Sequence, residues 1–86
     1  MTYRKKGRAI CWSLADMKAG ERGFVRSAPF GCTMESFDEV EFVGSNINSV
    51  TIKLRGGTLR VPREKAKGII ICGTREGVMA YEWTWR

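Results

Sequence analysis

The side chains of this chain that could do chemistry are few and scattered. Its three cysteines, Cys11, Cys32 and Cys72, have no CxxC spacing, and the sequence contains no histidine. A cysteine nucleophile needs a basic partner, and a structural zinc site needs clustered cysteine and histidine ligands. Glu39 and Glu41 alone make an incomplete oxygen site for a metal ion. The sequence therefore predicts no catalytic residue, no metal site and no cofactor, and the thiols are expected to be buried and inert.

Basic side chains offer a second kind of chemistry, the recognition of an acidic partner. The net charge is +6, from 15 Lys and Arg against 9 Asp and Glu. Basic residues gather in positions 1–8 and 53–67, whereas positions 35–41 are acidic. Such a distribution suits nucleic acid, anionic lipid or an acidic protein surface, although a solvated face is the simpler explanation. The predicted contact residues in this region are Lys53, Arg55, Arg60 and Arg63.

The last nine residues carry an aromatic stripe. Positions 78–86 alternate in character, which places Met79, Tyr81, Trp83 and Trp85 on one face of a strand. One interpretation is that these rings cover a flank of the fold, because strands bury aromatic faces. The other is a binding edge, which pairs with a partner strand or stacks on bases. Tyr81, Trp83 and Trp85 are therefore predicted to contact a partner.

The segment 50–71 indicates the fold that positions these residues. Val50, Ile52 and Leu54 alternate with polar residues, Gly56-Gly57 offers a tight turn, and the alternation then resumes. A helical turn is predicted at 62–66, followed by a short apolar strand at 69–71. Strand, turn, strand, helical turn and strand is the order that closes an SH3-like barrel. Barrels of this kind are mostly binding platforms.

The whole chain is predicted to be a single mostly β domain, an SH3-like five-stranded small barrel with one or two short helical turns. Residues 1–12 are expected to form a basic, mobile N-terminal arm, 13–72 the barrel and 73–86 an aromatic strand extension. The predicted core consists of Leu14, Met17, Phe24, Val40, Phe42, Ile52, Leu54, Leu59, Val61, Ala66, Ile69 and Ile71. No apolar run approaches the ~20 residues of a membrane helix, so no membrane insertion and a cytoplasmic location are expected.

Four segments resemble the FeoA (ferrous iron transport protein A) family, in the family's order. They are 14–25 (LADMKAGERGFV), 39–43 (EVEFV), 50–61 (VTIKLRGGTLRV) and 63–71 (REKAKGIII). The helical signature that the family carries between its first two strands is absent, and only residues 30–37 fill that interval. The resemblance implies an SH3-like fold and no enzymatic activity. It also implies a cytosolic accessory or regulator whose protein partner is the cytosolic part of a ferrous iron transporter.

Three functions compete at this point. The first is a non-catalytic protein adaptor that uses the barrel surface or the terminal strand. The second is a single-stranded RNA- or DNA-binding barrel, in which the outward basic residues of 53–60 contact phosphates, assisted by the basic residues of positions 4–8. The third is a phage-type inhibitor protein that blocks a target through one surface, a function suggested by size and charge segregation.

Overall fold

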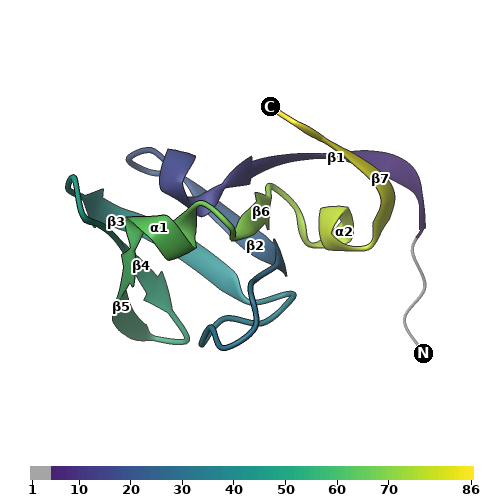
Figure 1. Cartoon of the computed structure of the whole chain (residues 1–86). Helices are drawn as coiled ribbons and strands as arrows, with labels where there is room; N and C mark the ends of the chain where they lie inside the picture. Colours follow the sequence, from purple (N-terminus) through teal and green to yellow (C-terminus); the bar gives the residue numbers. More distant parts are fainter. Residues whose placement is uncertain (1–4) are drawn as a thin grey trace.

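The protein is described by a computed structural model, which covers residues 5–86 of the chain and the side chains from residue 7 onward. Figure 1 shows a curved sheet with short helical segments at its ends and flanks. The elements are β1 (Lys5–Ser13), η1 (Leu14–Asp16), β2 (Arg22–Ser27), β3 (Glu39–Ser45), β4 (Ser49–Leu54), β5 (Gly57–Pro62), α1 (Arg63–Ala66), β6 (Ile70–Cys72), α2 (Arg75–Val78) and β7 (Ala80–Trp85).

All the strands within residues 5–86 belong to one sheet, and its order is β5-β4-β3-β2-β6-β1-β7. The neighbours from β5 to β1 are antiparallel, and β7 runs parallel to β1. The mostly β, SH3-like prediction is confirmed, and the described sheet has two strands beyond the five predicted for the barrel. They are β7, which is the predicted aromatic extension, and β1, which was not predicted; both lie beyond β6.

The predicted central hairpin is present, and its turn lies one residue earlier than expected. Leu54 pairs with Gly57, so the turn residues are Arg55 and Gly56. Both have positive φ, 52° and 80° respectively, as a type I′ hairpin turn requires. Arg55 tolerates this conformation while its guanidinium makes an ion pair with Asp38 at 2.6 Å. The alternation of the two strands is therefore as predicted, with Ile52, Leu54 and Val61 buried.

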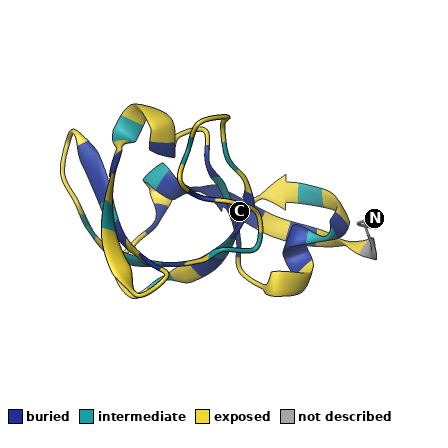
Figure 2. Cartoon of the chain, turned by 90° about the horizontal axis from the view of Figure 1, so that it is seen from below, coloured by how far each residue is buried: buried dark blue, intermediate teal, exposed yellow. Residues whose placement is uncertain are grey.

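A first hydrophobic cluster fills the curve of the sheet. Most of the predicted core residues belong to it, and Trp12, Val25, Met34 and Val50 join them. Phe42 and Leu59 lie at its margin, partly buried, and Phe24 belongs to a second cluster instead. Gly23 allows the close packing at its centre, because a Cβ there would lie 2.2 Å from Cγ2 of Ile71. Figure 2 shows that buried residues are spread along the strands and interspersed with exposed ones.

The prediction of a mobile arm over residues 1–12 is wrong for residues 5–12, which form most of β1. Residues 1–4 lie outside the described part of the chain, as do the side chains of residues 5 and 6. β1 is ordered because it pairs with β6 on one side and with β7 on the other. Side chains of β1 contribute to both hydrophobic clusters, because Trp12 belongs to the first cluster and Cys11 to the second.

The second cluster lies between the sheet and α2. Its buried members are Ala9, Cys11, Cys72, Val78 and Ala80. The segment that precedes the last strand contains α2, which begins where the Thr74 hydroxyl accepts a hydrogen bond from the Gly77 N–H at 3.0 Å. Gly77 is buried against the sheet, because an added Cβ would lie 3.3 Å from the Cβ of Ala9. This cluster anchors the start of the aromatic strand.

Candidate functional site

The strand β7 forms an edge of the sheet. Its register on β1 pairs Ala9 with Trp83 and Cys11 with Trp85, and no described strand pairs with its other side. The N–H of Arg86 donates to the carbonyl of Cys11 at 2.9 Å. Backbone groups alternate in direction along a strand, so those of Trp83 and Trp85 point away from β1. The aromatic residues therefore also present the unpaired backbone groups of the edge.

The aromatic stripe divides into one anchoring ring and two exposed rings. Trp83 is half-buried and packs against the second cluster, with its ring 5.9 Å from the guanidinium of Arg26. Tyr81 is 71% exposed and Trp85 is 55% exposed. Trp83 and Trp85 meet edge to face with ring centroids 4.8 Å apart. The first interpretation of the stripe thus describes Trp83, which covers a flank of the fold. The second remains open for Tyr81 and Trp85, whose rings are exposed.

Two grooves border Trp85. One of about 550 Å³ is lined by Trp12, Ala15, Asp16, Met17, Lys18, Trp85 and Arg86. The other, of about 360 Å³, is lined by Ser13, Ala15, Asp16, Arg63, Lys67 and Trp85. An exposed ring beside concave surface is the usual form of an anchoring residue in a protein interface. The surface formed by β7 and these two grooves is called the β7 surface below.

The last residue, Arg86, fixes one end of the β7 surface. Its guanidinium makes hydrogen bonds to both carboxylate oxygens of Glu21 and donates to the carbonyl of Asp16 at 2.9 Å. It also lies over the ring of Trp12, 4.4 Å from the centroid. The hydrogen bond from Arg86 is the main cause that lowers the pKa of Glu21, with the backbone N–H of Lys18 adding to it.

Arg26 fixes the other end from inside the protein. Its side chain is 8% exposed, and no described carboxylate makes an ion pair with it. It donates instead to the carbonyls of Gly77 at 2.7 Å and Ala80 at 3.1 Å, and more weakly to Val78 at 3.4 Å. Cations are favoured at the carbonyl end of a helix. Arg26 therefore joins β2 to the end of α2 and the first residue of β7.

The basic residues predicted on the hairpin lie at the opposite edge of the sheet from β7. Lys53 stands directly across from Glu41 on β3, and Arg55 is bound to Asp38. The acidic segment thus lies beside the basic hairpin and offsets part of its charge. Arg60 is exposed on β5 and lines a small hollow of about 150 Å³. These three residues do not join the aromatic residues in one site.

Arg63 is the predicted basic residue that does reach the β7 surface. It donates to the carbonyls of Asn46 at 2.6 Å and Ala15 at 3.3 Å, so it joins the β3–β4 turn to η1 while lining the groove beside Trp85. Sequence reasoning missed Trp12, Lys67 and Arg86 as members of this surface. These residues were missed because they are far apart in the sequence, and Trp12 and Arg86 meet only through the pairing of β1 with β7.

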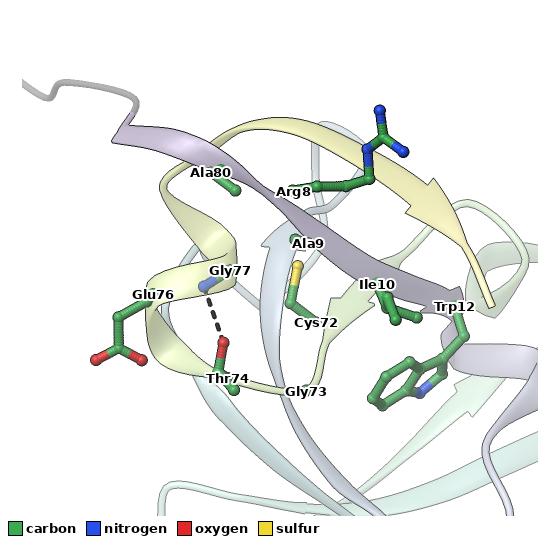
Figure 3. Close-up of a pocket in the computed structure, with 11 residues that line it drawn as sticks. Arg8, Ala9, Ile10, Trp12, Cys72, Gly73, Thr74, Glu76, Gly77 and Ala80 are labelled. Atoms are coloured by element: carbon green, nitrogen blue, oxygen red, sulfur yellow. Dashed lines mark hydrogen bonds between the residues drawn. The ribbon is translucent and has the colours of Figure 1, made fainter.

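A further groove was not predicted at all. It has a volume of about 430 Å³ and lies between β1 and the segment that leads into α2. Figure 3 shows Ile10 and Trp12 projecting from β1 beside Gly73. Ile10 is 58% exposed, and its position between basic residues and cysteine gave no sign of a groove. The Nε1 of Trp12 is buried without an acceptor among the residues that the structure describes.

No group of three or more His, Cys, Asp or Glu side chains within residues 5–86 could hold a metal ion. None of the helices in the same range has the length and apolar character needed to span a membrane.

Comparison with known proteins places the fold. No protein-family model matches this sequence, and none of the curated proteins does either. Among solved structures, an iron uptake regulatory protein (FeoA) matches with a TM-score of 0.66 and 13% identity, covering 73% of this chain and 96% of its own. A manganese-dependent transcriptional repressor matches with a TM-score of 0.68 and 9% identity, covering 77% of this chain and 43% of its own. The chain thus has the FeoA-like, SH3-like fold. In this protein the same sheet also carries β7, with the grooves beside Trp85.

Proposed function

We propose that this chain is a non-catalytic protein-binding module that receives an extended segment of its partner along β7. The observation that carries the proposal is that β7 is a sheet edge whose unpaired backbone groups belong to residues with aromatic side chains. Edge strands bind extended peptides through backbone hydrogen bonds, while alternate side chains enter neighbouring pockets. Tyr81 and Trp85 supply the exposed rings, and the grooves beside Trp85 supply the pockets.

The partner is proposed to be the cytosolic part of a ferrous iron transporter. The fold shared with an iron uptake regulatory protein supports a role as an accessory or regulator of iron transport. Between β2 and β3, residues 28–38 contain no helix and no strand, so the family's helical segment is missing here. This difference favours β7 as the docking element. A net charge of +6 favours an acidic partner segment.

A single-stranded nucleic acid is the second candidate ligand of the same surface. Trp85 and Lys67 line one groove, where a base could stack on the ring while a phosphate meets the ammonium. The salt dependence of the binding affinity distinguishes protein binding from nucleic-acid binding. Phosphate-driven affinity for a single strand falls by roughly 0.7 log units per neutralised phosphate for each tenfold rise in salt, whereas strand pairing with an apolar anchor depends far less on salt.

The experiment is a titration of the transporter's cytosolic domain against the wild-type chain and four variants of it. Trp85→Ala should weaken binding by about 30-fold, the loss typical of a hot-spot residue. Tyr81→Ala removes a ring and keeps the edge N–H, whereas Tyr81→Pro removes both, so the proline variant should bind more weakly than the alanine variant. Arg60→Ala, at the opposite edge, is the control and should bind as the wild type does. Equal affinity of the wild type and all four variants would contradict docking on β7.

A further inference from the structure

Cys11 and Cys72 face each other across β1 and β6. They are register partners on these antiparallel strands, and both side chains are fully buried. Their Sγ atoms lie 2.9 Å apart. Figure 3 shows Cys72 pointing toward β1 beside Ala9. The third cysteine, Cys32, lies in the loop between β2 and β3 at the margin of the first cluster.

The backbone hydrogen bonds set the spacing of this pair. The N–H of Leu14 donates to the carbonyl of Ile69 at 2.9 Å, in the same register as the β1–β6 pairing. Hydrogen-bonded and non-hydrogen-bonded pairs alternate along antiparallel strands, so Trp12–Ile71 is a bonded pair and Cys11–Cys72 is a non-bonded one. In non-bonded pairs the Cα atoms are about 4.5 Å apart, which lies within the range that a disulfide spans. The strands need not separate to accommodate the bond.

The surroundings of the two sulfurs control access to them. The second cluster encloses both sulfurs, and an added Cβ at Gly77 would lie 3.2 Å from the Cβ of Cys72. Burial, together with the hydrogen bond to Cys72, raises the pKa of Cys11 to about 12. The thiolate is the attacking species in thiol–disulfide exchange. Exchange therefore begins when β1 opens locally or before the chain has folded.

We propose that Cys11 and Cys72 are a disulfide-forming pair whose oxidant is a small-molecule disulfide such as glutathione disulfide. One cysteine thiolate attacks glutathione disulfide, forms a mixed disulfide and releases one glutathione. The sulfur of the other cysteine then displaces the second glutathione. Two electrons and two protons leave the protein, and one glutathione disulfide becomes two glutathione molecules. The bond joins β6 to β1, the strand that holds β7, so oxidation clamps the β7 surface to the barrel.

In the test, the full chain is refolded from urea in buffers that contain an increasing fraction of oxidised glutathione. The unfolded chain exposes both thiols, so burial does not block the exchange reaction. We expect a mass loss of about 2 Da from the two hydrogens removed, and a peptide map that links Cys11 to Cys72. The oxidised protein should melt higher, by on the order of 10 °C, because the cross-link closes a long loop.

Three cysteine variants sharpen the result. Cys32→Ser should oxidise as the wild type does, whereas Cys11→Ala and Cys72→Ala should not form the internal bond. The wild-type map decides the matter even if a core variant fails to fold. A folded wild-type product that stays fully reduced in the most oxidising buffer would overturn the proposal, and so would a link that involves Cys32 or a second molecule.

Discussion

The guanidinium of Arg86 lies 4.4 Å from the ring centroid of Trp12. Trp12 belongs to the first hydrophobic cluster, and Arg86 directly follows the last residue of β7. This contact ties the end of the aromatic strand to the interior of the barrel. It also places the exposed ring of Trp85 at a fixed position between two grooves. The β7 surface is therefore held by residues from both ends of the sequence.

Replacing Arg86 should loosen β7. Arg86→Ala removes the hydrogen bonds to Glu21 and the contact with Trp12, and we expect the free energy of unfolding to fall by about 1–2 kcal/mol. Arg86→Lys should recover only part of the lost stability, because the lysine ammonium cannot make the bidentate hydrogen bonds that a guanidinium makes to a carboxylate. Urea denaturation measures both changes, with Arg60→Ala as a control on an exposed strand position. A loss for Arg86→Ala no greater than that of the control would show that the contact is dispensable.

Acid should weaken the same end of β7. The hydrogen bond from Arg86 holds the pKa of Glu21 below its ordinary value near 4.5, so the folded protein favours the carboxylate. The resulting stability is fully present above that ordinary value and is lost as pH falls through the lower, folded pKa. Urea midpoints measured from neutral pH to pH 2 should fall more steeply for the wild type than for Glu21→Gln. Glu35→Gln, at an exposed loop position, should keep the wild-type slope; identical slopes in all three proteins would refute the assignment.

Gly23 should not tolerate a methyl group. An added Cβ would lie 2.2 Å from Cγ2 of Ile71 and 2.9 Å from the carbonyl of Cys72. We expect Gly23→Ala to cost about 3 kcal/mol, at the upper end of the usual cost of overpacking, because the backbone at Cys72 cannot yield. Gly44→Ala is the matched control on β3, where an added Cβ meets nothing within 4 Å. Thermal melting of the two variants compares them directly, and equal melting temperatures would mean that the sheet accommodates the methyl group.

Arg26 should matter more for stability than an ordinary strand arginine. Arg26→Ala leaves the carbonyls of Gly77 and Ala80 without their donor, and we expect a loss of about 2–4 kcal/mol. Arg26→Lys keeps the charge but cannot reach both carbonyls at once, so it should be intermediate. Chemical denaturation followed by tryptophan fluorescence also reports on Trp83, whose ring lies beside the guanidinium. An alanine variant as stable as the wild type would remove Arg26 from the anchoring of β7.

The barrel was predictable because its signals are local. Alternation, a glycine turn and a helical turn within residues 50–71 specify the hairpin and the chain that follows it. β1 was missed because its partners are distant along the chain, as the pairing of Arg8 with Glu82 illustrates. Its basic residues come first and an apolar run over residues 9–12 follows, so no period-two alternation marks a strand.

The site was predictable only in part, for the same reason. Tyr81, Trp83 and Trp85 follow from the alternation of one strand. The role of Arg26 depends on carbonyl groups more than 50 positions away, which no sequence pattern marks. The basic hairpin was expected to be a free patch, but the folded sheet sets Lys53 across from Glu41 and binds Arg55 to Asp38. Charge counted along a chain does not show which charges become neighbours.

Amide hydrogen exchange of the chain, with and without the cytosolic domain of the iron transporter, tests the central claim most directly. Docking of an extended segment on β7 would give the edge amides of Tyr81, Trp83 and Trp85 new hydrogen bonds. We predict that their exchange slows by at least about tenfold on binding, while the amides of the β4–β5 hairpin keep their rates. Protection confined to that hairpin, or unchanged exchange along β7 at saturation, would contradict the proposal that β7 is the docking strand.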